Sequence, residues 1–110
     1  MKLSPQEIHD TKEFISFFDA IPKNQWCTGY QNILKTDGTI LHCAIGHMTN
    51  LPHSTFQKKM DKLDNLLSKL YSRFEYSEWM YIVYTNDAAK EYGNHPKERI
   101  INALKSLLKE

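Results

Sequence analysis

Residue types that define specialised classes of protein are scarce in this sequence. Its 110 residues include only 4 glycines and 4 prolines, and no linker, repeat or low-complexity segment interrupts it. No apolar run approaches the roughly 20 residues that a membrane-spanning helix needs, so we expect no membrane partner. The sequence has 2 cysteines, Cys27 and Cys43, and Met1–Glu7 shows no apolar signal region. We therefore expect a cytoplasmic protein with free thiols.

The sequence also lacks an excess of charge of either sign. Lysine and arginine together number 14 and aspartate and glutamate 13, which gives a formal net charge of +1 at pH 7. An electrostatic field that attracts nucleic acid or anionic lipid requires a clear excess of positive charge. We expect no bulk nucleic-acid binding.

What is present is the composition of an ordinary globular protein. Charged residues make up 25% of the chain, apolar residues 41% and aromatic residues 12%, whereas disordered chains are charge-rich and poor in aromatics. A chain of this length holds one hydrophobic core, which predicts a single domain over residues 1–110. The order of its elements predicts a mainly α fold of the α+β kind. Four or so helices pack with one small β-hairpin at about 29–43.

Two helices have clear sequence signals. Ser4-Pro5-Gln6-Glu7 predicts a helix start, because a capping serine, an early proline and a glutamate that reaches back are the residues of a capping box. The longest helix begins near His53, and its apolar residues alternate four-residue and three-residue steps. This stripe predicts a core-facing helix, with a coiled-coil or oligomer interface as the alternative. The stripe consists of Phe56, Met60, Leu63, Leu67, Leu70 and Phe74.

The hairpin is predicted by Asp37-Gly38, which lies between two short apolar runs, as the tight turns of β-hairpins do. The later run 79–84 fits either a strand or a buried helical segment, and its periodicity does not decide between them.

Short polar residues and prolines mark the remaining helix starts. Asn86 or Asp87 is predicted to cap a short helix that ends at Tyr92, and His95-Pro96 is predicted to open a final helix.

Cys43 is the candidate nucleophile, because it falls where the hairpin ends and a short helical turn begins. Amides at a helix start lower the pKa of a thiol and can hold an oxyanion. With His47 as the base and Asp87 as the orienting group, Cys43 would form a cysteine-dependent hydrolase. Packing is the other interpretation, because cysteine is among the most often buried residues and Cys43-Ala44-Ile45-Gly46 is typical of a tight helix-to-sheet contact.

A metal site is not predicted, and neither is a cofactor. His42, Cys43, His47 and His53 lie close in sequence, but zinc sites are typically built from paired ligands such as C-x-x-C, and those pairs are missing.

Three short motifs occur in order along the chain. They are Trp26 with Gly29 (W-x-x-G), Cys43-Ala44-Ile45-Gly46 (C-A-x-G) and Asn86-Asp87 (N-D), and an amphipathic helix from Arg99 follows. In this respect the chain resembles a family of small uncharacterised proteins of actinobacteria and bacteriophages. The resemblance implies a compact fold and a phage origin, hence a host-cytoplasmic location, but no mechanism.

The resemblance also groups residues from separate segments into one site between the hairpin and the C-terminal helices. Aromatic residues in such a site can stack a base, and Asn and Asp can bind polar groups. We expect a non-enzymatic binding protein, a phage accessory or counter-defence factor that captures a host protein or a small nucleotide-like ligand. The alternatives are the Cys43 hydrolase and a structural or homo-oligomerising domain. The predicted ligand-binding residues are Trp26, Gly29, Tyr30, Cys43, Gly46, Tyr84, Asn86 and Asp87.

Overall fold

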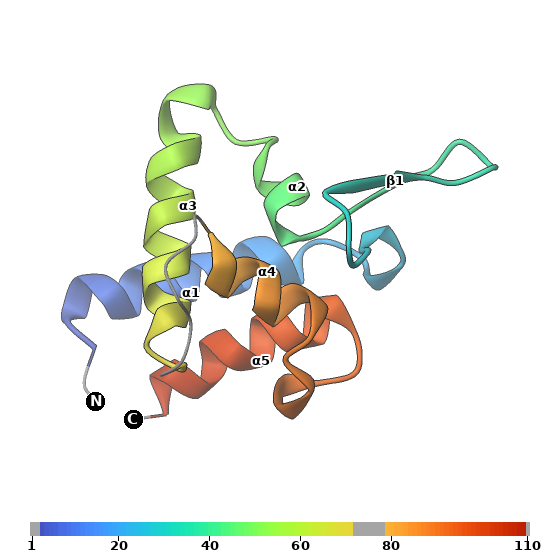
Figure 1. Ribbon diagram of the computed structural model, residues 1–110. Coiled ribbons are helices and arrows are strands. Elements are labelled where there is room, and N and C mark those ends of the chain that lie inside the picture. Colours follow the sequence, from blue (N-terminus) through green and yellow to red (C-terminus); the bar gives the residue numbers. More distant parts are fainter. Residues whose placement is uncertain (1–2, 72–78, 110) are drawn as a thin grey trace.

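The computed structural model describes residues 3–71 and 79–109 and confirms a mainly helical fold with one small hairpin (Figure 1). Within this part of the chain there are five α-helices, two strands and two short 3-10 turns. The helices are α1 (Pro5–Asp19), α2 (Ala44–Met48), α3 (His53–Ser68), α4 (Met80–Asp87) and α5 (Pro96–Leu108). The strands are β1 (Asn32–Leu34) and β2 (Ile40–His42), and the 3-10 turns are η1 (Lys23–Gln25) and η2 (Lys90–Tyr92).

The first and last helices begin where local sequence signals place them. At α1 the Ser4 hydroxyl accepts a hydrogen bond from the Glu7 amide at 3.1 Å, and the Glu7 carboxylate accepts one from the Ser4 amide at 2.9 Å. At α5 the Nδ1 atom of His95 accepts from the Lys97 amide at 3.1 Å. Each side chain satisfies a helix-start amide that has no partner within its helix.

Strands β1 and β2 pair antiparallel, with Ile33 opposite Leu41 and Leu34 opposite Ile40. The turn between them needs Gly38, whose φ of +89° is a left-handed conformation that side chains disfavour. Figure 1 shows the hairpin projecting away from the helices.

The stripe predicted for the longest helix is buried along its middle. Met60, Leu63 and Leu67 are buried, whereas Phe56 is half-buried at the start of α3. The helix ends at Ser68, earlier than the stripe predicts, because the Lys69 amide turns back to the carbonyls of the preceding turn. Leu70 therefore packs half-buried beyond the helix end, and Phe74 lies outside the described residues.

Residues 80–84 of the ambiguous run belong to helix α4, which continues through Asp87, and Trp79 precedes the helix with a φ of +59°. An acidic side chain of α3 supports its start, since the carboxylate of Asp64 accepts from the Ile82 amide at 3.2 Å. The prediction that Asn86 or Asp87 caps a following helix is wrong, because both residues form the last turn of α4. Only the short turn η2 follows before α5.

The hydrophobic core lies between the helices, where α1 and α4 both pack against α5 and α3 packs against α4. Its fully buried side chains come from every α-helix and include Phe18, Met48, Met60, Leu63, Leu67, Ile82, Ile100 and Leu104. No helix in the described ranges is long and apolar enough to cross a membrane.

Candidate functional site

A small pocket lies between the segment that precedes the hairpin, the start of α2 and one side of α4. Its volume is about 190 Å³. Five of the eight predicted ligand-binding residues line it, namely Gly29, Tyr30, Cys43, Asn86 and Asp87. The other lining residues are Gln31, Ile45, Ile82 and Val83. We refer to this cavity as the Asp87 pocket.

Backbone hydrogen bonds bring the pocket's separate segments together. The Cys43 amide donates to the Gln31 carbonyl at 3.1 Å, and the Cys27 amide donates to the His42 carbonyl at 3.0 Å. Gly29 has a φ of +79°, the left-handed conformation that lets the chain turn from Cys27 toward β1. The mouth of the pocket is thus tied to the base of the hairpin.

Asn86 connects these segments to α4 and is 1% exposed. Its Oδ1 atom accepts from the Ala44 amide at 3.0 Å, and its Nδ2 atom donates to the Cys27 carbonyl at 3.0 Å. Its backbone carbonyl accepts two hydrogen bonds from the buried Arg99 guanidinium, at 2.9 and 2.8 Å. Asn86 therefore caps α2 from a distant part of the chain. We call the contacts among Cys27, Ala44, Asn86 and Arg99 the Asn86 junction.

Asp87 has a different environment from its neighbour. Its side chain is half-buried at the pocket wall, and its Oδ1 atom accepts from Nδ2 of Asn86 at 2.7 Å. Across residues 3–71 and 79–109, no cation lies within ion-pair distance of this carboxylate. The pocket therefore presents a negative charge that the described chain does not neutralise.

The thiol of Cys43 does not have the activated character that its position suggested. Burial raises its pKa above the ordinary value, the amides of Gly46 and Ile45 offset part of that effect, and the charge of Asp87 raises the pKa further. A thiol with a raised pKa stays protonated at neutral pH and is a poor nucleophile. The expectation of a lowered pKa at the start of α2 is wrong, because burial outweighs the helix-start amides.

His47 is not positioned as a base for Cys43. It is 4% exposed, and its ring contacts the rings of Trp26 and His42, with centroids 4.7 and 5.1 Å away. Burial lowers its pKa to about 4, and the nearby His42 contributes to that decrease. The His47 amide donates to the Cys43 carbonyl at 2.9 Å as part of the α2 backbone, but within the described structure no side-chain hydrogen bond joins the His47 ring to Cys43 or Asp87. The buried Nε2 atom of His47 has no partner there. The three residues do not form a catalytic triad.

Three predicted ligand-binding residues lie outside the pocket lining. Trp26 is a core residue, 5% exposed, and its indole nitrogen donates to the Ile21 carbonyl at 3.4 Å. Gly46 permits a close approach between α2 and the pre-hairpin segment, since a Cβ there would clash with the Gln31 carbonyl. Tyr84 is half-buried, and its ring makes a T-shaped contact with the Tyr71 ring.

Sequence reasoning missed the apolar wall of the pocket and the role of Arg99. Ile82 and Val83 lie in the run 79–84, and the periodicity of that run does not decide between a strand and a helix. The face on which each side chain lies could therefore not be assigned from the sequence. Arg99 was placed on the last helix, but nothing in its local sequence indicated that it holds the Asn86 carbonyl. The described residues contain no group of three or more His, Cys, Asp or Glu side chains that could hold a metal ion.

The fold and the pocket define a small helical protein with a hairpin-flanked acidic cavity. Comparisons with protein-family models, with curated proteins and with solved structures gave no match for the chain.

Proposed function

We propose that this chain is a non-enzymatic binding protein that captures a partner protein with the Asp87 pocket and the exposed face of the hairpin. The observation that carries the proposal is the unneutralised carboxylate of Asp87 in a pocket flanked by exposed apolar side chains. Interfaces combine such apolar anchors with a small number of placed polar groups.

The apolar side chains lie on both sides of the pocket mouth and out along the hairpin. Tyr30 is 70% exposed and Val83 44% exposed, and both line the pocket. Leu34 is 71% exposed and Ile40 51% exposed. These two residues are directly opposite in the strand register, so their side chains share one face of the hairpin. We call Tyr30, Leu34, Ile40 and Val83 the hairpin surface.

The chemistry of the pocket favours one basic side chain of the partner as its occupant. Ile45 and Val83 can contact the aliphatic stem of a lysine or arginine, and Asp87 can pair with its cationic end. A volume of about 190 Å³ is below the range of roughly 300 to 1,000 Å³ that is usual for pockets that hold whole small molecules. The size therefore supports a single inserted side chain over a complete nucleotide-like ligand.

The alternatives have less support. A Cys43 hydrolase would need an activated thiol and an adjacent base, and neither the raised pKa of Cys43 nor the core position of His47 supplies them. An oligomerising role for the α3 stripe would need an exposed stripe, but Met60, Leu63 and Leu67 are each 0% exposed within the fold. The proposal that the partner is a host protein bound by a phage accessory or counter-defence factor rests on the family resemblance of the sequence motifs.

A peptide titration followed by amide chemical shifts tests the proposal. The probe is the capped tripeptide Leu-Arg-Leu, and Leu-Glu-Leu is its charge-reversed control. We expect saturable shifts at Tyr30, Val83 and Asp87 with the arginine peptide only. Asp87→Asn should weaken that binding, since it removes the charge and keeps an acceptor for Asn86. Asp19→Asn, which alters an exposed carboxylate outside the pocket, should leave it unchanged.

Three outcomes would contradict the proposal. Equal shifts with both peptides would show that the charge of the peptide does not determine binding. Unchanged arginine-peptide binding by the Asp87→Asn variant would show that the Asp87 carboxylate does not contribute to it. Saturable binding of adenosine at the same residues, without binding of the arginine peptide, would indicate that the pocket binds a small nucleotide-like ligand and not a protein partner.

A further inference from the structure

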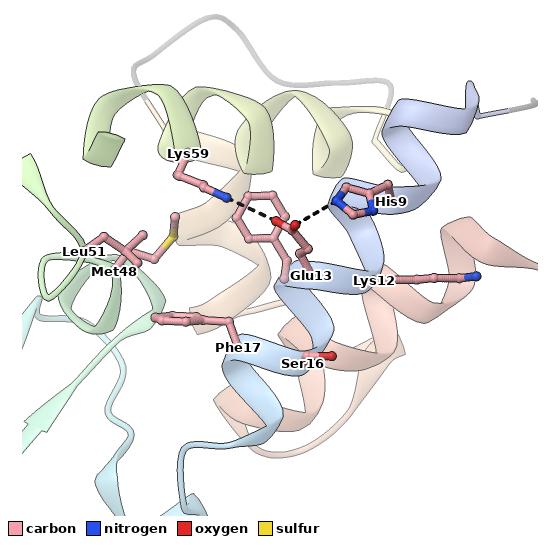
Figure 2. A pocket seen from close by; sticks show the side chains of 9 residues that line it. His9, Lys12, Glu13, Ser16, Phe17, Met48, Leu51 and Lys59 are labelled. Carbon is pink, nitrogen blue, oxygen red and sulfur yellow. Dashed lines mark hydrogen bonds and ion pairs between the residues drawn. The ribbon is translucent and has the colours of Figure 1, made fainter. Parts of the chain in front are cut away.

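A second and larger cavity lies on another side of the molecule, where α1, α3 and the end of α2 meet (Figure 2). Its volume is about 580 Å³, and it shares no lining residue with the Asp87 pocket. It is lined by His9, Lys12, Glu13, Phe14, Ser16, Phe17, Met48, Leu51 and Lys59. We call this cavity the α1–α3 groove. Its size falls within the range of pockets that enclose small organic ligands.

The floor of the groove is apolar. Phe14 and Met48 belong to the hydrophobic core, and the half-buried Phe17 and Leu51 pack against that core. Figure 2 shows Phe17, Met48 and Leu51 on the same side of the cavity, toward the end of α2. Met48 is 0% exposed, so the apolar surface open to a ligand belongs to Phe17 and Leu51. A ligand that covers these two side chains would remove apolar surface from water, which favours binding in proportion to the area covered.

The charged residues of the lining come from α1 and α3, and Figure 2 shows Lys59 reaching from α3 toward Glu13. Lys59 of α3 pairs with Glu13 of α1 at 3.2 Å and lies 6.0 Å from the centre of the Phe14 ring. Glu13 also pairs with His9 at 2.8 Å. Lys12 also lines the groove and is exposed. The lining therefore includes two lysines, Lys12 and Lys59, and one carboxylate, that of Glu13. The groove thus has an excess of positive charge beside an apolar floor.

We propose that the α1–α3 groove binds a small amphipathic anion, an apolar chain or ring that carries one carboxylate. The apolar part covers Phe17 and Leu51 next to the buried Met48, and the carboxylate pairs with Lys59 alongside or in place of Glu13. The excess positive charge selects an anionic head group over a neutral or cationic one. This site is independent of the partner-binding surface and does not require the Asp87 pocket.

Methyl NMR of the methionines offers a direct test, because Met48 lines the groove and Met80 starts α4 elsewhere in the fold. The probes are decanoate, 1-decanol and decylammonium, each titrated into the full chain labelled at its methionine methyls. We expect decanoate to shift the Met48 methyl saturably and to leave Met80 unchanged. Decanol and decylammonium should bind at least threefold more weakly, as expected when one partly exposed ion pair is missing.

Variants of neighbouring lysines locate the head group. Lys59→Met should weaken decanoate binding about threefold to fivefold and leave decanol binding unchanged. Lys58→Met, which removes an exposed lysine outside the groove, should change neither. If Lys59→Met does not give a folded spectrum, Lys59→Gln makes the same comparison with a polar side chain. The proposal fails if decanoate does not shift Met48, if the three probes bind equally, or if the Lys58 and Lys59 variants behave alike.

Discussion

The Asn86 junction and the hairpin surface use their side chains in opposite ways. In the junction, the side chain of Asn86 is 1% exposed and bonds to the Ala44 amide and the Cys27 carbonyl, while Arg99 holds its carbonyl. On the hairpin surface, Leu34 is 71% exposed although it is apolar. Buried polar groups need partners within the fold, whereas an exposed apolar face gains free energy only from a partner outside it. The difference separates residues that maintain the fold from residues that are available for binding.

Asn86→Ala should show the largest effect on stability. It leaves the Ala44 amide and the Cys27 carbonyl buried without partners, and each such group costs about 1 to 3 kcal/mol. We expect a loss of about 2 to 6 kcal/mol in the free energy of unfolding, measured by urea titration. Asn102→Ala is the matched control, because Asn102 is exposed and makes one hydrogen bond, to the Tyr92 carbonyl. Similar losses in the two variants would show that the junction does not hold the segments together.

Two leucines allow the comparison to be made with one chemical change. Leu67→Ala removes a side chain that is 0% exposed in the core and should cost about 2 to 5 kcal/mol. Leu34→Ala removes one that is 71% exposed and should change stability by less than about 0.5 kcal/mol. Thermal or urea unfolding measures both. A large loss for Leu34→Ala would indicate that the hairpin surface supports the fold.

His47 should make stability depend on pH. Its pKa in the folded protein is about 4, below its ordinary value of 6.5, so unfolding takes up a proton between these values. The stabilisation is complete above about pH 6.5 and decreases as the pH falls toward 4, by up to about 3 kcal/mol. His47→Phe should reduce this dependence, measured as the unfolding free energy at several pH values. His53→Phe, a change at an exposed histidine, should have the same pH dependence as the unsubstituted chain.

The smallest expected effect concerns the reactivity of Cys43. Because burial raises the pKa of its thiol, iodoacetamide at neutral pH should label native Cys43 more slowly than it labels glutathione. Asp87→Asn removes a charge that raises this pKa, so labelling should become faster. Mass spectrometry of the alkylated chain measures both rates. Rapid labelling of the unsubstituted protein below neutral pH would restore the hydrolase hypothesis.

Much of the fold was predictable because its signals are local. The capping box at Ser4 and Glu7, the turn at Asp37 and Gly38 and the start of α5 at His95 each depend on residues a few positions apart. Their hydrogen bonds and backbone angles follow from the preferences of those residues in any context. The α3 stripe was also predictable where it repeats regularly, but the end of the helix was not, because no glycine or proline marks it.

The candidate site was predictable only in part. The sequence motifs brought Gly29, Cys43, Asn86 and Asp87 into one group, and the structure places all four on one pocket. The exposure of Tyr30 and Val83 and the core positions of Trp26 and His47 depend on which elements pack against them. Local sequence does not contain that information.

The sequence by itself thus determined the class of fold, the hairpin and most of its helices, because short-range preferences act within each segment. Only the tertiary structure decided that 80–87 is helical, that Asn86 joins segments 42 and 59 residues away, and that Asp87 remains without a cation in the described chain. These features arise when distant segments meet, since burial, hydrogen-bond partners and nearby charges are properties of the packed chain. The same reason explains why the α1–α3 groove, formed where α1, α2 and α3 meet, had no signal in the sequence.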